Sequence, residues 1–550
     1  MAERLTDRWE KQWVLLHAGA CFALFLYYLL WQVNFYLAET LLYTVMPYGM
    51  ALLVVLYFCF RRLKDGWEMR LLLAFWLWYL LTRVLTGDIG VEGEFVRTLE
   101  LLIGFLFLPL GLLLNRKQRE HLLDLVCVVT GLFYFVLGVL ALYVFLMRTE
   151  LINPITEGYI AYASENEFTR LAVMDQNPNV TGLWFMMGFF LMIYAFSRSK
   201  KLYLRIPIVL AGIVDYLCIA LSYSRNTKFT VSVGLAMLVV LLLLRRFKEK
   251  KKNVRIIAVV LAMVVMVPCV YESFNVSAEL FGKWSASVTE SDSTSEEESE
   301  PKELKGTSAS SPALLGAHVF TNENKLSSTA KENAWVDEPD ENGEWGYGPW
   351  MDAVEDPDQP EGPWADPDLE METSFPSEEP KLFTDTRGLK SVGELNGRIY
   401  IYQSIPITFQ SEPLRMLIGS SEEDLMHYTN EMPRYKDNNR EMQHMHNSWL
   451  QALMLTGIPG FLLTAAFTVL LVRRMIRLYF SKNPKAALQI KILTIPVTAV
   501  LMYHLLETGI FIFTDVRACY FFLLAGMVIA WSRELEPGQK KSRPIEITAP

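Results

Sequence analysis

Residues Val180–Ser197 read VTGLWFMMGFFLMIYAFS and carry no charged side chain. A helix needs roughly 17–25 apolar residues to cross the hydrocarbon core of a bilayer. Because lipid offers no hydrogen-bond partner to backbone amides, helix is the expected conformation for such a stretch. The sequence therefore predicts a transmembrane helix here.

The same pattern recurs along the whole chain, in which 52% of the 550 residues are hydrophobic. We identify about twelve blocks by their length and their lack of charge. In chain order the blocks are Gln12–Val33, Leu41–Phe60, Leu71–Leu85, Phe95–Leu114, His121–Met147, Val180–Ser197, Ile206–Ser222, Phe229–Leu244, Ile256–Tyr271, Ser448–Val472, Ile492–Phe513 and Cys519–Trp531. The predicted fold is an all-α polytopic membrane protein of about twelve transmembrane helices, with a large extracytoplasmic loop between the ninth and the tenth.

Basic residues predict the orientation of these helices. Lys and Arg gather before the first block, in every second connection and in the C-terminal tail, for example at Arg61, Arg116, Arg198, Arg245 and Arg473. Because cytoplasmic connections carry the excess of Lys and Arg, both termini are predicted to be cytoplasmic. We expect a multi-pass protein of the cytoplasmic membrane. The formal net charge of -9 arises because acidic residues concentrate in one outward segment.

Composition divides the chain into five parts. We predict membrane helices one to nine in residues 1–272, an acidic low-complexity extracytoplasmic insert in 273–385, amphipathic extracytoplasmic helices in 386–447, helices ten to twelve in 448–532 and a cytoplasmic tail in 533–550. Ser285–Pro312 is rich in Ser, Thr and Glu and should be disordered, since it cannot bury enough apolar surface to fold. Trp335–Pro380 is acidic with scattered aromatic residues, which fits a solvated linker or a cation- or sugar-binding insert. From about Gly388 apolar residues return at helical spacing.

His446 lies where the outward loop enters the tenth block, in the stretch His446-Asn447-Ser448-Trp449-Leu450. An imidazole at the membrane edge has a tunable protonation state and is within reach of a lipid-borne substrate. Capping or interfacial anchoring is the simpler alternative for a lone histidine at this place. His444 and His427 are nearby alternatives for the same role. Asn447 either orients the imidazole or caps the helix that follows.

Three further basic residues lie on the outward side, against the usual bias of basic residues to the cytoplasm. Arg225 and Lys228 lie in a hairpin between two short blocks, and Arg398 lies ahead of the tenth block. Arginine forks match diphosphate oxygens. Singly, each residue could instead snorkel or pair within its loop. Together beside a histidine, with no metal-ligand pattern in the outward sequence, they predict an anion site.

His504 and Glu507 in the eleventh block are ionisable residues within an apolar stretch. Their spacing of three residues predicts that they share one helical face. Such residues inside a membrane are functional candidates by default. We expect them to pair with each other or to line the path to the site.

Several motifs, taken in their order along the chain, resemble the O-antigen ligase and polymerase superfamily. They are the Arg170…Asn177-Pro178-Asn179 turn, the Ser224-Arg225 hairpin, the Gly397-Arg398 element and the His446-Asn447-x-x-Leu450…Gly457-x-x-Gly460 segment. The resemblance covers roughly Val180–Phe513. The acidic insert of about Ser285–Leu382 has no counterpart in that pattern, which leaves the substrate open.

The resemblance implies a membrane-embedded, inverting glycosyltransferase that needs neither metal nor other cofactor. Such an enzyme moves a glycan from an undecaprenyl diphosphate carrier to a hydroxyl of an acceptor glycan or lipid, as a surface-polysaccharide ligase or polymerase. His446 would be the general base, and Arg225 and Arg398 would stabilise the leaving diphosphate. The remaining candidates would contact the phosphates or the glycan: Lys228, Arg170 and Asn447.

Two other classes of protein compete with this interpretation. A flippase or transporter for the same lipids predicts internal repeats and charges near the bilayer midplane, which the sequence does not display. A sensor or scaffold that uses the acidic loop leaves Arg225, Arg398 and His446 without a task. We therefore expect an enzyme at the extracytoplasmic face whose partners are the lipid-linked glycan, the acceptor and the bilayer, and not nucleic acid. Ligase and polymerase differ only in the acceptor.

Overall fold

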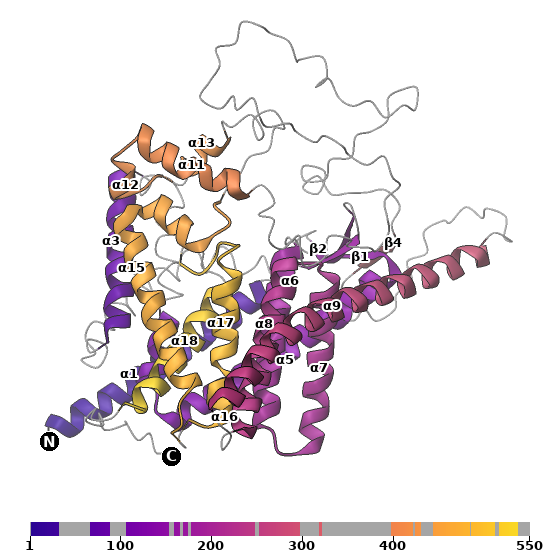
Figure 1. The fold of residues 1–550 in the computed structure, drawn as a ribbon, viewed down its shortest axis with the longest axis horizontal. Helices are drawn as coiled ribbons and strands as arrows, with labels where there is room; N and C mark the ends of the chain where they lie inside the picture. The colour runs from indigo at the N-terminus through magenta and orange to yellow at the C-terminus, as the bar shows by residue number, and fades with distance from the viewer. Residues whose placement is uncertain are drawn as a thin grey trace, which may run out of the picture.

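A computed structural model describes residues 2–31, 66–87, 106–152, 159–165, 169–173, 178–247, 252–296, 318–321, 398–421, 424–430, 444–483, 486–511 and 516–536. These parts of the chain are mostly helical (Figure 1). Within them, nine helices are long and apolar enough to cross a membrane. The expectation of a mostly helical chain is confirmed, and the nine helices fit a multi-pass membrane protein.

Nine predicted blocks fall in these long helices. The helices are α1 (Ala2–Trp31), α3 (Trp67–Thr86), α5 (Arg116–Met147), α6 (Pro178–Arg198), α7 (Leu202–Leu221), α8 (Arg225–Arg246), α9 (Lys252–Glu296), α15 (Ser448–Tyr479) and α18 (Val516–Glu534). The second block, Leu41–Phe60, lies outside the described residues. Of the fourth block only residues 106–114 are described, and 106–113 are helical. The total of about twelve spans stays a prediction.

The eleventh block does not form one continuous helix. It contains the end of α16 (Leu488–Ile492) and α17 (Thr494–Tyr503), after which residues 504–511 turn. The polar start of α15 captures carbonyls of this turn, since the Ser448 amide donates to His504 O at 3.1 Å and Asn447 Nδ2 donates to Leu505 O at 2.8 Å. The prediction that His504 and Glu507 share a helical face is therefore wrong.

Three helices lie together at the upper left of the helical part in Figure 1, and we call this end of the molecule the upper side. They are α11 (Arg398–Ser411), α12 (Arg415–Ile418) and α13 (His427–Asn430). Helices are predicted in this region, although its part before Arg398 lies outside the described residues. On α11 the buried side chains are Ile401, Ser404 and Thr408, while Tyr402 and Ile405 of the predicted apolar stripe are half-buried.

The opposite ends of the long helices carry a buried ionic cluster. Glu68, at the start of α3, is 1% exposed. Its carboxylate accepts from Arg474 Nε at 2.8 Å and from an Arg533 guanidinium nitrogen at 2.5 Å. Since Arg474 and Arg533 lie near the ends of α15 and α18, the cluster joins three helices at the side away from α11–α13.

A small antiparallel sheet interrupts the helices between α5 and α6. Its strands are β1 (Thr149–Ile152), β2 (Tyr159–Glu165), β3 (Thr169–Val173) and β4 (His318–Thr321), in the order β3-β2-β1-β4. Leu151, Ala161 and Leu171 are buried, each on a different strand. The all-α prediction did not include this sheet, because strands this short offer only a few residues of period-two alternation.

The ninth helix continues well past the predicted boundary at residue 272. Tyr216 of α7 donates to Ser273 Oγ at 2.9 Å and stacks on Phe274 with ring centroids 4.5 Å apart. Further along, Ser285 Oγ donates to Leu146 O at 2.9 Å. Packing on α5 and α7 therefore extends α9 into the stretch predicted to be disordered. Apart from β4, the insert beyond Glu296 lies outside the described residues.

Gly457 kinks α15 near its upper end. Its backbone has φ 66° and ψ -172°, and an added Cβ would lie 2.4 Å from Leu417 O. The guanidinium of the fully buried Arg83 donates to Ser420 O at 2.6 Å and to Leu455 O at 2.5 Å. Ser420 follows α12 and Leu455 lies in α15, so Arg83 bridges the two segments that meet at Gly457. Arg83 and the kink thus fix the upper part of α15 against α12, and so position the residues just before Ser448.

Candidate functional site

His446 and Glu507 form a pair on the upper side, where the chain enters α15. His446 Nδ1 lies 3.2 Å from Glu507 Oε2. The His446 side chain is 24% exposed and that of Glu507 is 12% exposed, so the pair is sheltered yet open to a ligand. The backbone of His446 adopts φ 48°, a left-handed conformation that is costly for a residue with a Cβ. Such strain is concentrated at functional sites, where the surrounding structure enforces it.

Hydrogen bonds from both sides hold the His446 backbone in place. Asn447 caps α15, since its Oδ1 accepts from the amides of Trp449 and Leu450, each at 3.0 Å. Ser448 Oγ donates to Glu507 O at 3.2 Å, and Tyr402 of α11 donates to His446 O at 3.4 Å. Of the two roles considered for Asn447, capping is the one that the hydrogen bonds support, and its contact with Leu505 also orders the turn that carries Glu507.

Glu507 is the site residue that sequence reasoning misassigned. The sequence marks it as an ionisable residue in an apolar block, but a continuous helix would pair it with His504. The turn after Tyr503 directs its carboxylate to His446 instead, while His504 Nδ1 lies 3.2 Å from Glu507 O. The sequence identifies Glu507 as a candidate because it is an ionisable residue in an apolar block, and only its partner required the tertiary structure.

The Ser224-Arg225 hairpin lies beside this turn. Ser224 caps α8, and Asn226 Nδ2 donates to Tyr503 O at 2.9 Å. Tyr503 is followed directly by His504, whose carbonyl accepts from the Ser448 amide. Residues 503 and 504 therefore link Asn226, which follows Arg225, to the segment that carries His446. The structure therefore brings the hairpin and the histidine segment to the same side of the molecule.

Arg170 braces the same hairpin. Its Nε donates to Ser222 O at 3.1 Å, and a terminal guanidinium nitrogen donates to Asn179 Oδ1 at 3.0 Å. Tyr503 Oη in turn donates to Asn179 O at 2.8 Å. Arg170 and Asn179 thus join β3, α6, the hairpin and α17, which gives Arg170 a positioning role.

The side chain of Lys228 is described by the structure, whereas that of Arg398 is not. Lys228 is fully buried, its Nζ donates to Asn275 Oδ1 at 3.0 Å, and it lies 4.5 Å above the Tyr223 ring. These contacts tie α8 to α9 rather than present the ammonium group to a ligand. Arg398 is the first residue of α11, one helical turn before Tyr402, and its side chain lies outside the described residues.

The two alternative histidines lie in different surroundings. The His444 ring centroid is 4.4 Å from that of His446, so His444 belongs to the same site. His427 is exposed on α13 and packs edge-on against Tyr428. The structure thus favours His444 over His427 as a second titratable group beside the pair.

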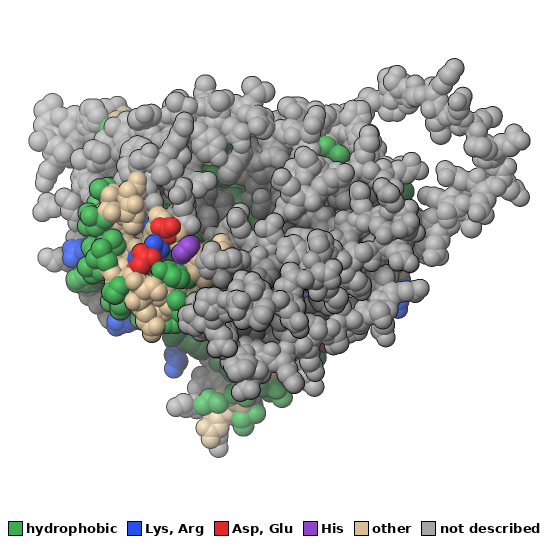
Figure 2. All heavy atoms as spheres, turned by 90° about the horizontal axis from the view of Figure 1, so that it is seen from above, with side chains coloured by type: hydrophobic (Ala, Val, Ile, Leu, Met, Phe, Trp, Pro, Cys, Tyr) green, Lys and Arg blue, Asp and Glu red, His purple; other side chains and the backbone are tan. Residues whose placement is uncertain are grey.

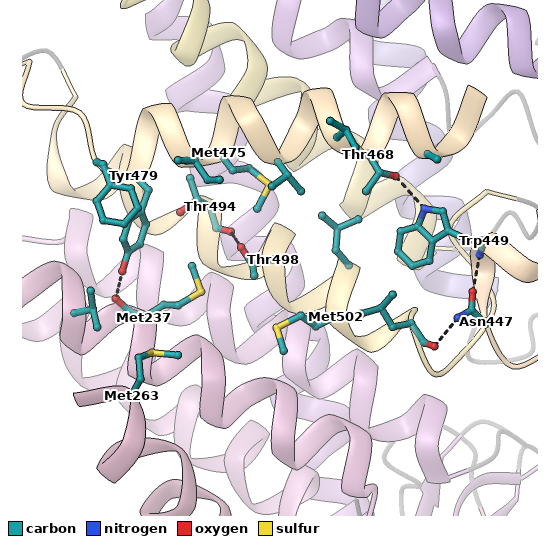
Figure 3. Close-up of a pocket in the computed structure, with 18 of the residues that line it drawn as sticks. Met237, Met263, Asn447, Trp449, Thr468, Met475, Tyr479, Thr494, Thr498 and Met502 are labelled. Carbon is teal, nitrogen blue, oxygen red and sulfur yellow. Dashed lines mark hydrogen bonds between the residues drawn. The ribbon is translucent and has the colours of Figure 1, made fainter. Parts of the chain in front are cut away.

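An apolar groove of about 770 Å³ begins next to this site. Figure 3 shows Asn447 and Trp449 at one end and Tyr479 and Met237 at the other, with Met475 and Met502 between them. Helices α8, α9, α15 and α17 supply its walls. The hydroxyls of Thr468, Thr498 and Tyr479 donate to main-chain carbonyls. They are therefore already satisfied, and the groove suits a hydrocarbon chain.

The described surface over α12 and α13 does not form a basic patch. Seen from above in Figure 2, acidic and basic side chains lie next to one another there, surrounded by apolar ones. Arg415 pairs with Glu412 at 2.6 Å and with Asp424 at 3.3 Å. Positive charge for an anion must come from elsewhere, and Arg225 and Arg398 remain the candidates.

Comparison of the chain with protein-family models, with curated proteins and with solved structures finds no match. The similarity to the O-antigen ligase superfamily therefore rests on the sequence motifs alone, and the function is argued from the site.

Proposed function

We propose that this protein is an inverting glycosyltransferase of the extracytoplasmic face of the cytoplasmic membrane. It transfers a glycan from an undecaprenyl diphosphate carrier to an acceptor hydroxyl, as a ligase or polymerase of surface polysaccharide, and it requires no metal. The observation that carries the proposal is the half-buried His446–Glu507 pair at the mouth of an apolar groove. Chemistry on a lipid carrier requires a titratable group next to a surface that binds a hydrocarbon chain, and the dyad and the apolar groove provide these two features.

The dyad supplies the base. With Glu507 at Nδ1, the imidazole is oriented and its other nitrogen, Nε2, is left to accept a proton. The carboxylate also stabilises the imidazolium that forms. General-base catalysis of this kind contributes typically about 10²–10⁴-fold to the rate.

The transfer step balances without a further reactant. The acceptor oxygen attacks the anomeric carbon from the face opposite the diphosphate and gives its proton to His446 Nε2. The bond to the diphosphate oxygen breaks, and its electron pair stays with the diphosphate. Arg225 and Arg398 would stabilise this growing negative charge, which is the electrostatic task that metals perform in many soluble transferases. Attack from the opposite face inverts the configuration.

The groove accounts for the lipid. Its α15 wall runs from Phe461 to Phe480, about 28 Å at about 1.5 Å per residue, close to the thickness of a hydrocarbon core. The polar end at Asn447 adjoins His446. A prenyl chain in the groove would therefore deliver its diphosphate to the dyad and to the Ser224-Arg225 hairpin.

The test follows release of undecaprenyl diphosphate from a lipid-linked oligosaccharide by the purified full-length protein. We expect release to require an acceptor, to fall about 10²–10⁴-fold in His446→Ala, and to fall also in Arg398→Ala. The matched control is His121→Ala, an exposed histidine in the second turn of α5. Unchanged release in His446→Ala would refute the assigned base. Movement of the lipid across liposomes without any release would favour the alternative, a lipid-linked oligosaccharide flippase.

A further inference from the structure

Three side chains of metal-binding types converge at the upper side. His444, His446 and Glu507 each offer one ligand atom, and these atoms all lie within 4.8 Å of one another. We propose that they form a binding site for one divalent transition-metal ion such as Zn²⁺. The sequence had predicted no metal here, because Glu507 is distant from the two histidines along the chain.

The donor set and its spacing fit this class of ion. Two imidazole nitrogens and one carboxylate oxygen form a three-ligand site of the type that leaves a fourth position for water or a ligand. Zinc bonds of about 2.0–2.2 Å in tetrahedral geometry place neighbouring donors about 3.3–3.5 Å apart. His446 Nδ1 and Glu507 Oε2 are already at 3.2 Å. The His444 donor lies within 4.8 Å of these two atoms, and in the proposed site it closes on the same ion.

The protein holds two of the three ligands before any ion binds. His446 is fixed at φ 48°, and Ser448 binds both segments of the site through its amide to His504 O at 3.1 Å and its hydroxyl to Glu507 O at 3.2 Å. Such outer contacts orient ligands and raise metal affinity. The partial exposure of His446 and Glu507 gives the ion a route from the upper side.

Occupancy would switch the transferase off, a consequence that rests on the proposed function. A neutral imidazole that coordinates through Nδ1 carries its proton on Nε2, the nitrogen that must be free to accept the acceptor's proton. Metal binding and general-base catalysis by His446 are therefore mutually exclusive. The ion acts as an inhibitor and not as a cofactor.

The binding test uses Co²⁺ as a coloured probe on full-length protein purified in detergent without a polyhistidine tag. We expect about one equivalent of bound cobalt with visible d–d absorption, displaced by Zn²⁺. The variants His444→Ala and Glu507→Gln should lose this uptake, and His121→Ala should retain it. No stoichiometric uptake by the wild type overturns the proposal without recourse to any variant. Equal uptake by wild type, His444→Ala and Glu507→Gln overturns it as well.

A second measurement separates the two proposals. Cobalt uptake is measured without lipid substrate, so an inactive transferase leaves its outcome unaffected. If the transferase is active, chelator should raise its rate and Zn²⁺ should abolish it. The enzyme could be active and bind the metal at His446 and Glu507 without being inhibited. That result would contradict the role of His446 as base but would support the metal site.

Discussion

Substitution of Gly457 by alanine tests the kink that positions the site. Gly457 lies at φ 66° and ψ -172°, a region that is essentially restricted to glycine and costs other residues about 1–3 kcal/mol. The new Cβ would also lie 2.4 Å from Leu417 O and 2.6 Å from Leu417 C, both backbone atoms that cannot rotate away. Relieving that overlap adds about 1–3 kcal/mol, as overpacking does elsewhere. The expected total is a loss of about 2–6 kcal/mol.

Gly87 provides the matched control. It caps α3 at φ 85° and ψ -2°, an ordinary left-handed conformation, and nothing lies within 4 Å of an added Cβ. Gly87→Ala should therefore cost only about 1–2 kcal/mol. The assay is reversible unfolding in mixed detergent, followed by tryptophan fluorescence. Gly457→Ala should also reduce glycan transfer, since α15 begins at the His446 segment. Equal destabilisation by the two substitutions would refute the contact between Gly457 and α12.

Three more substitutions test the helix packing and the groove. Glu68→Ala removes the buried carboxylate shared by two half-buried arginines, of which Arg474 keeps Glu536 as a partner, and should destabilise the protein by about 1–3 kcal/mol in the same unfolding assay. Asp215 in α7 is buried, and neither carboxylate oxygen has a hydrogen-bond partner among the described residues. Asp215→Leu should therefore stabilise by about 1–3 kcal/mol, and a loss would reveal a partner for the carboxyl. Ala465→Trp fills the groove and should raise the KM for the prenyl-linked donor, whereas Leu132→Trp on the exposed face of α5 should leave it unchanged.

The sequence predicts the helices well where composition alone decides. Val180–Ser197 becomes α6 within two residues at its start and one at its end, because an uncharged apolar stretch of that length has no competing conformation in lipid. The N-cap of α15 is equally local, since the Asn447 side chain accepts hydrogen bonds from the amides two and three residues further along the chain. Features of this kind need no tertiary information.

The rest depends on contacts between distant parts of the chain. Glu507 meets His446 only because polar groups at the start of α15 end the helix at Tyr503. The sequence predicts Lys228 to be an outward cation, yet Lys228 is buried and donates a hydrogen bond to Asn275 of α9. Periodicity in the sequence identifies candidates but does not choose their partners, so the residue types of the site were predictable and their pairing was not.

The central claim is that the dyad, the hairpin and the groove form one site for a lipid diphosphate. An experimental structure of the full-length protein with undecaprenyl diphosphate bound tests it most directly. We predict the prenyl chain in the groove between Asn447 and Tyr479, and the diphosphate within hydrogen-bond reach of Arg225 and Arg398 beside His446. A lipid bound elsewhere, with its diphosphate remote from His446, would contradict the account.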